Sequence, residues 1–127
     1  MKPSIFLVIK AVISLAFGLA FAAIPGIVGP LYGIQLDPTG VLMARWFGAL
    51  LIGIGIICIF AGKATGTKLQ QDVILSLFIA DVLGSVVAVV GQLSGLMTAL
   101  GWTIVAVWII LALGLGYLRF IWKAPAQ

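Results

Sequence analysis

The sequence predicts an all-α fold: an integral membrane four-helix bundle with both termini on the cytoplasmic side. Three observations lead to this prediction. The chain of 127 residues is 64% hydrophobic and 8% charged, which is more apolar surface than a water-soluble domain of this length can hide. The apolar residues fall into four stretches, each close to the roughly 20 residues that a helix needs to cross a bilayer. Lysine and arginine follow an alternating pattern at the ends of these stretches.

The chain has the length of one domain, and we expect residues 1–127 to form a single transmembrane domain. The first expected helix, about residues 4–24, ends where prolines and glycines between Pro25 and Gly33 break a helix. An alternative for this segment is a secretory signal, because a basic start, an apolar stretch and the sequence Ala20-Phe21-Ala22 resemble a signal peptide with its cleavage site. Lys10 interrupts the apolar stretch and favours a retained helix.

The other three helices are expected at about residues 41–61, 73–91 and 97–121. The second follows a turn at Asp37-Pro38-Thr39-Gly40, with Thr39 as its N-cap. A polar loop, residues 62–68, precedes the third, and Asp72 near its start suits the positive end of the helix dipole. Residues 92–95 form a tight connection to the fourth.

Basic residues mark one side of the expected membrane. Lys2, Lys63, Lys68, Arg119 and Lys123 belong to the N-terminus, the middle loop and the C-terminal end, whereas the first and third loops contain neither lysine nor arginine. Because basic residues concentrate on the cytoplasmic side, both termini are expected in the cytoplasm. The same bias argues against an assembly in which the chain inserts in both orientations.

The residue types present exclude several classes of function. The net charge of +4 comes from isolated basic residues without a basic run, so no nucleic-acid partner is expected. The chain has no histidine, and Cys58 is its single cysteine. This composition removes histidine-ligated haem, the usual zinc and copper sites, an internal disulfide and histidine-dependent nucleophiles. We expect no cofactor, no metal site and no catalytic residue, and an enzyme ranks last among the functions considered.

Small residues recur four apart in each expected helix, as at Ser14, Gly18 and Ala22 in the first and at Gly84 and Ala88 in the third. Helices in lipid associate through such residues because they let two backbones approach closely. We expect these faces to pack the helices of one chain against each other. The alternative is that one of them holds a homo-oligomer together.

Three charged residues fall inside the apolar stretches, where a charge is costly and therefore a candidate for function. Lys10 is expected to extend its side chain back to the inner membrane surface, and Arg45 to reach the outer headgroups, where it could bind an anionic lipid or solute. Asp81 lies near the middle of its helix and is too short to do the same. Neither cation lies at its depth, so we expect Asp81 to be protonated at neutral pH.

Other polar side chains could join Asp81. Ser85 and Gln92 share its helix face, and Ser14 is a candidate across the bundle. These residues, together with Arg45, make up the predicted ligand-binding or ion-binding set. The alternative for Asp81 is a structural hydrogen bond between helices.

Three segments carry a resemblance to known sequences: Pro30 to Gly40, Ala44 to Ala49 with its Arg45-x-x-Gly48-Ala49 pattern, and Ala80 to Gly84. They resemble a widespread set of small four-helix bacterial membrane proteins of unknown function. The resemblance covers nearly the whole chain. It implies the four-helix fold and a bacterial inner-membrane location, implies no activity, and points to Arg45 and Asp81 as residues to test.

Two functions compete. The first is a non-enzymatic protein that binds a lipid or another apolar ligand, or that is an accessory subunit of a larger complex. The second is a small oligomeric transporter or channel that uses Asp81 and Arg45. The expected partners are the lipid bilayer and either further copies of the chain or a larger membrane complex.

Overall fold

The computed structural model describes residues 2–123, and this part of the chain is all-α. Its helices are α1 Pro3–Ala23, α2 Pro25–Leu31, α3 Pro38–Lys63, α4 Lys68–Leu93 and α5 Gly101–Phe120. All except α2 are long and apolar enough to cross a membrane. The prediction of an all-α fold with four such helices is confirmed for the described residues.

The short helix α2 was not predicted. The residues between Pro25 and Gly33 do end α1, but they then form a helix of their own. Pro25 stands in the first turn of α2, where a proline loses no hydrogen bond and its fixed φ suits the helix. Gly33, with a φ of 76°, turns the chain out of α2 toward α3.

The helices α3 and α4 start several residues earlier than the expected residues 41 and 73, whereas α5 starts at Gly101, later than the expected residue 97. Asp37, not Thr39, is the N-cap of α3, because its side chain accepts a hydrogen bond of 2.6 Å from the Gly40 amide. Thr67 caps α4 in the same way, so this helix starts at Lys68 instead of residue 73. Hydropathy alone misses these polar first turns, since they lie outside the apolar stretch.

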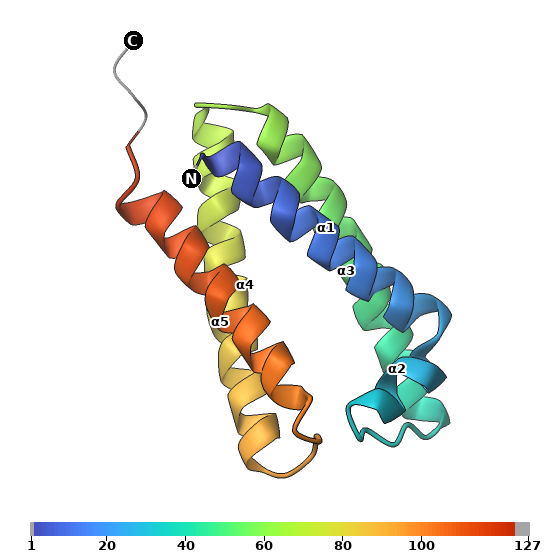
Figure 1. Ribbon diagram of the computed structural model, residues 1–127. Helices are drawn as coiled ribbons and strands as arrows, with labels where there is room; N and C mark the ends of the chain where they lie inside the picture. Colours follow the sequence, from blue (N-terminus) through green and yellow to red (C-terminus); the bar gives the residue numbers. More distant parts are fainter. Residues whose placement is uncertain (1, 124–127) are drawn as a thin grey trace.

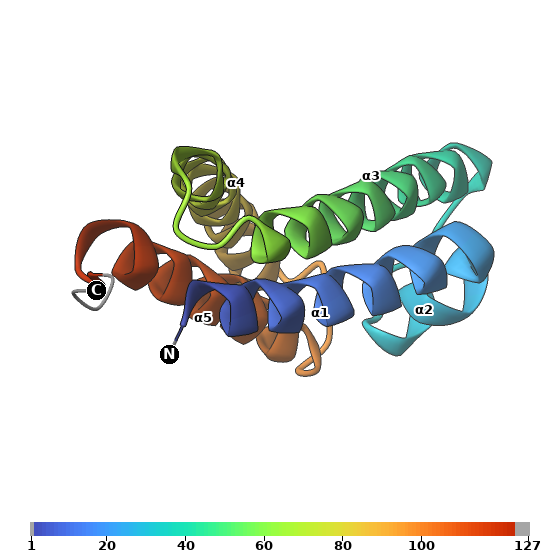
Figure 2. The ribbon, with the colours of Figure 1, turned by 90° about the horizontal axis from the view of Figure 1, so that it is seen from above.

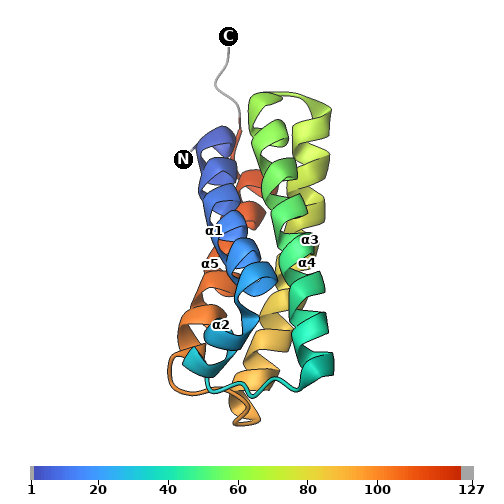
Figure 3. The same ribbon diagram turned by 90° about the vertical axis from the view of Figure 1, so that its right-hand side faces the viewer.

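The four long helices are arranged as two antiparallel pairs. Figure 1 shows α1 beside α3 and α4 beside α5, with the pairs close together near the two chain ends and farther apart toward α2. Figure 2 and Figure 3 show the same pairing from above and from the side. The α3–α4 connection lies at the same end as both termini, so the basic residues at the N-terminus, in this loop and at the end of α5 share one end of the molecule.

Within the pairs, small residues allow close approach. A Cβ atom at Gly48 of α3 would lie 2.5 Å from the Ala22 nitrogen and 2.6 Å from the Gly18 carbonyl oxygen of α1. In the other pair, the Trp108 ring of α5 occupies the space beside Gly84 of α4. The prediction that small residues pack helices of one chain together is confirmed at these two contacts.

The pairs meet through a hydrophobic core near the chain ends. Each long helix contributes two fully or nearly fully buried residues: Leu7, Ala11, Cys58, Ala61, Ile74, Leu77, Leu115 and Leu118. At the opposite end, the loops before α3 and before α5 are tied together, because the Thr98 amide donates a hydrogen bond of 2.8 Å to the Tyr32 carbonyl oxygen. The two helix pairs are thus joined at both ends.

Candidate functional site

Lys10 of α1 and Asp81 of α4 form a buried ion pair between the two helix pairs. The ammonium Nζ donates to both carboxylate oxygens, at 2.9 Å to Oδ1 and 2.8 Å to Oδ2. Lys10 is 4% exposed and Asp81 is 2% exposed. Burying both charges costs free energy of desolvation. The close contact between the ammonium and the two carboxylate oxygens offsets this cost.

This pair corrects two expectations. Lys10 does not extend toward the chain end, and Asp81 has the cationic partner that the sequence analysis did not find. Asp81 lies about 20 Å from the start of α4, whereas Lys10 lies only about 10 Å from the start of α1. The two side chains still meet, because the α3–α4 connection, and with it the start of α4, lies beyond the start of α1 (Figure 1). Pairing then satisfies both charges at once. The two short contacts suit an ammonium and an ionised carboxylate, and the charge state of Asp81 stays a prediction.

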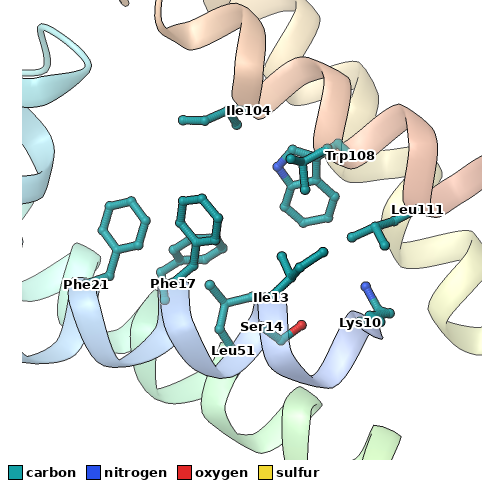
Figure 4. A pocket seen from close by; sticks show the side chains of 11 residues that line it. Lys10, Ile13, Ser14, Phe17, Phe21, Leu51, Ile104, Trp108 and Leu111 are labelled. Carbon is teal, nitrogen blue, oxygen red and sulfur yellow. The ribbon is translucent and has the colours of Figure 1, made fainter. Parts of the chain in front are cut away.

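Beside the pair lies an apolar cavity of about 100 Å³, bounded by α1, α3 and α5. Figure 4 shows Phe17 and Phe21 of α1 facing Ile104 and Trp108 of α5, with Lys10 and Ser14 toward the other end. Ser14 is one helical turn beyond Lys10, which places both side chains on the same face of α1. The cavity therefore has apolar walls and one polar end.

A larger groove of about 710 Å³ lies between α3, α4, α5 and the loops at the α2 end. Its lining includes Gly84, Val87 and Gly91 of α4 together with Leu96 and Met97 of the following loop. The groove and the cavity share three lining residues, Phe47, Ile104 and Trp108. The cavity and the groove therefore adjoin at these three side chains, between the helix pairs.

The structure brings only part of the predicted site together. Asp81 holds Lys10, and Ser14 lines the cavity beside Lys10. The Ser85 hydroxyl donates to the Asp81 backbone carbonyl oxygen at 2.7 Å, a contact within α4 that leaves the carboxylate untouched. Gln92 donates to the Thr98 carbonyl oxygen at 3.2 Å and so belongs to the loop before α5. Arg45 is exposed on α3 and lines neither the cavity nor the groove.

Lys10 was considered among the intramembrane charges but left out of the predicted site, and the aromatic lining of the cavity was not predicted. A signal for Lys10 was present, because a cation and an anion within apolar helices usually pair with each other. Phe17 and Phe21, four residues apart, share one face of α1 with Ser14 and Lys10 at helical spacing. Phe47 and Trp108 come from other helices, and nothing in the one-dimensional pattern relates them to that face.

Comparison with known proteins agrees with the resemblance seen in the sequence. No curated protein and no solved structure matches the chain. The family model described as Domain of unknown function (DUF8292) matches residues 2–118, which is nearly the whole chain. The prediction of a family of unknown function is thereby confirmed. The chain belongs to the DUF8292 family.

Proposed function

We propose that this chain is an integral membrane protein that binds a lipid or another apolar molecule between its two helix pairs. Large apolar side chains are exposed along the long helices, among them Val87 at 72%, Leu113 at 69% and Leu50 at 68%. Surfaces this apolar are stable in a hydrocarbon solvent and unstable in water. The basic end of the molecule faces the cytoplasm in this proposal, in a bacterial inner membrane, because cytoplasmic ends carry the excess of lysine and arginine.

One observation carries the binding proposal: the apolar space between the pairs, made of the cavity and the larger groove. Ligand sites commonly have volumes of about 300 to 1,000 Å³ and mostly apolar walls with few polar groups. The groove of about 710 Å³ falls within that range. The adjoining cavity adds aromatic walls and a polar end at Ser14 and Lys10.

The charges of the site favour binding over chemistry. Lys10 and Asp81 hold each other through both carboxylate oxygens and have little exposed surface, so neither is poised to exchange a proton with a substrate. Arg45, the other charge expected to take part, lies apart from them. These positions give a transporter that uses Asp81 and Arg45 together no specific support. Partners in this proposal are the bilayer lipids and, at the exposed helix faces, further copies of the chain or a larger membrane complex.

The test is to fill the groove without disturbing the backbone. Gly91 lines the groove, and a Cβ atom there would meet only Met97 Cε, at 3.8 Å, an ordinary van der Waals distance. Gly91→Phe should therefore fold while its ring occupies the groove. Gly53→Phe is the matched control, since Gly53 is also inside a long helix, has nothing within 4 Å of its Cβ position and lines neither space.

The measurement is native mass spectrometry after the wild type and both variants are purified in a mild detergent. We expect the wild type and Gly53→Phe to retain an apolar molecule of defined mass, and Gly91→Phe to lose most of it. Equal retention by all three proteins would place bound lipid on the outer surface and contradict the proposal. A wild type that retains nothing, even when supplied with extracted membrane lipids, would contradict it as well.

A further inference from the structure

We infer that the ligand is a neutral amphiphile, with a carbonyl or hydroxyl oxygen that binds at Ser14 and an apolar body that extends along the aromatic walls. This inference rests on the proposed function, because it names the ligand class of the same apolar space. Ser14 is 4% exposed and lines the cavity. Figure 4 shows its oxygen on the side of α1 that bears Lys10 and the cavity.

The Ser14 hydroxyl differs from other hydroxyls in the helices. Ser76 and Ser85 of α4 donate to backbone carbonyl oxygens four residues earlier, at 2.9 Å and 2.7 Å, and Thr103 donates to the carbonyl oxygen of Leu100 at 2.6 Å. Among residues 2–123, the Ser14 hydroxyl has no such bond to a backbone carbonyl oxygen of its own helix, and it lines the cavity instead. A hydroxyl at the wall of an apolar cavity is more stable with a hydrogen-bond partner, so a ligand oxygen at this position would gain a hydrogen bond from Ser14.

Lys10 supplies a second donor at the same end of the cavity. A lysine ammonium has three N–H groups, and Asp81 accepts two of them. The third has no acceptor among the described residues. An oxygen placed between the Ser14 hydroxyl and the Lys10 ammonium would accept from both.

The ion pair also sets the charge of the ligand. Lys10 is already neutralised by Asp81, so an anionic head group would compete with that carboxylate and leave one negative charge buried. A cationic head group would face the remaining ammonium protons. A neutral oxygen escapes both costs, and the aromatic walls formed by Phe17, Phe21 and Trp108 suit a hydrocarbon body.

Two brominated probes of equal length test the inference, 12-bromododecan-1-ol and 1-bromododecane, which differ only in the hydroxyl group. Bromine quenches tryptophan fluorescence on contact. Trp108 lines the cavity, so replacing Trp46, Trp102 and Trp122 by Phe leaves it as the only reporter. Native mass spectrometry of the protein with all its tryptophans is the second measurement, since the bromine isotope pattern identifies the bound probe.

We expect the alcohol to bind about three- to tenfold more tightly than the bromoalkane, the range for one or two hydrogen bonds to a neutral oxygen. Ser14→Ala should reduce this preference to near unity while alkane binding persists, and Ser14→Thr, which keeps a hydroxyl, should restore it. Equal affinities in the wild type, or an unchanged preference in Ser14→Ala, would overturn the inference and leave the proposed function standing. Binding of neither probe would overturn both.

A competition experiment distinguishes a quinone from a lipid alcohol as the ligand that supplies this oxygen. A dodecyl-substituted benzoquinone presents a carbonyl oxygen on a ring, and dodecan-1-ol presents a hydroxyl on a linear chain. Displacement of the bromoalcohol by the quinone would assign the site to quinones, and displacement by the alcohol alone would assign it to lipid alcohols. Failure of both unlabelled compounds to displace the probe would show that the bromine, not the oxygen, determines binding, and would overturn the inference.

Discussion

Removing one member of the Lys10–Asp81 pair should destabilise the protein much more than removing both. The two side chains are 5% and 3% exposed, so solvent hardly screens them. Losing one partner of a buried pair leaves the other charge uncompensated, which costs about 3 to 5 kcal/mol. Lys10→Met and Asp81→Leu should each lower the free energy of unfolding by that amount. The double variant, with two apolar side chains facing each other, should lie within about 1 kcal/mol of the wild type or be more stable.

Reversible unfolding in detergent mixtures, followed by circular dichroism, measures these free energies. The chain provides an internal control in Lys68 and Asp72, which form an ion pair of the same length, 2.8 Å, on the surface of α4, with side chains 88% and 52% exposed. Lys68→Met and Asp72→Leu should each cost about 0.5 kcal/mol or less, because exposed pairs contribute little. If Lys10→Met and Asp81→Leu cost no more than these surface changes, the reasoning from burial is refuted.

The same variants reveal the charge state of Asp81. Its two short contacts to the Lys10 ammonium predict an ionised carboxylate. The infrared band of a protonated carboxyl group should therefore be missing from the wild type at neutral pH and appear in Lys10→Met, where an unpaired carboxylate in an apolar site is more stable with its proton. A band in the wild type that disappears in Asp81→Asn would restore the expectation of a neutral Asp81.

Three further predictions concern packing, capping and orientation. Gly84→Leu should lower the melting temperature more than Leu75→Ala, because its side chain must displace the Trp108 ring, and overpacking costs about 1 to 3 kcal/mol; equal melting temperatures would place Gly84 on an open surface. Asp37→Ala should lower the free energy of unfolding by about 1 kcal/mol and Thr39→Ala by only a few tenths, as measured by denaturant unfolding. The reverse order would show that Thr39 is the N-cap of α3. A cytoplasmic reporter fused after Gln127, which lies outside the described residues, and a periplasmic reporter near Asp37 should both be active; a periplasmic C-terminus would contradict the orientation.

The long helices could be predicted because their signal is local. Each is an apolar stretch of bilayer length, and no tertiary contact is needed to recognise it. The helix starts at Pro38 and Lys68 depend on single side-chain caps at Asp37 and Thr67, which compete with nearby polar residues of similar capping strength. The short helix α2 begins in a segment whose prolines and glycines predict a break, and prolines also favour the first turn of a helix. Sequence pattern alone does not choose between these two outcomes.

The site could be predicted only in part, because it depends on how the helices are arranged in space. Asp81 and Ser14 stand out in the sequence as polar residues in apolar stretches. Asp81 belongs to the ion pair, and Ser14 lies at the polar end of the cavity beside it. Lys10 was not predicted as the partner of Asp81, because a lysine near the start of a membrane helix usually extends its side chain to the membrane surface. Two residues 71 positions apart meet only after the helix pairs have been placed relative to each other.

The position of the ion pair explains how an apolar protein keeps an apolar space open. In hydrocarbon there is little drive to bury apolar side chains against each other, so helices associate where backbones approach closely or polar groups bond. Close backbone approach holds α1 to α3 at Gly18 and Gly48, and in the other pair the Trp108 ring of α5 packs into the space beside Gly84 of α4. Between the pairs, the polar connections include Lys10 with Asp81 and the Gln70 amide with the Ala61 carbonyl oxygen near the core, and Tyr32 with Thr98 at the opposite end. A buried ion pair adds little net stability over apolar residues of the same size, but it fixes which parts of two helices lie side by side. Connections beside the core and at the α2 end therefore set the separation of the pairs, with the cavity and the groove between them.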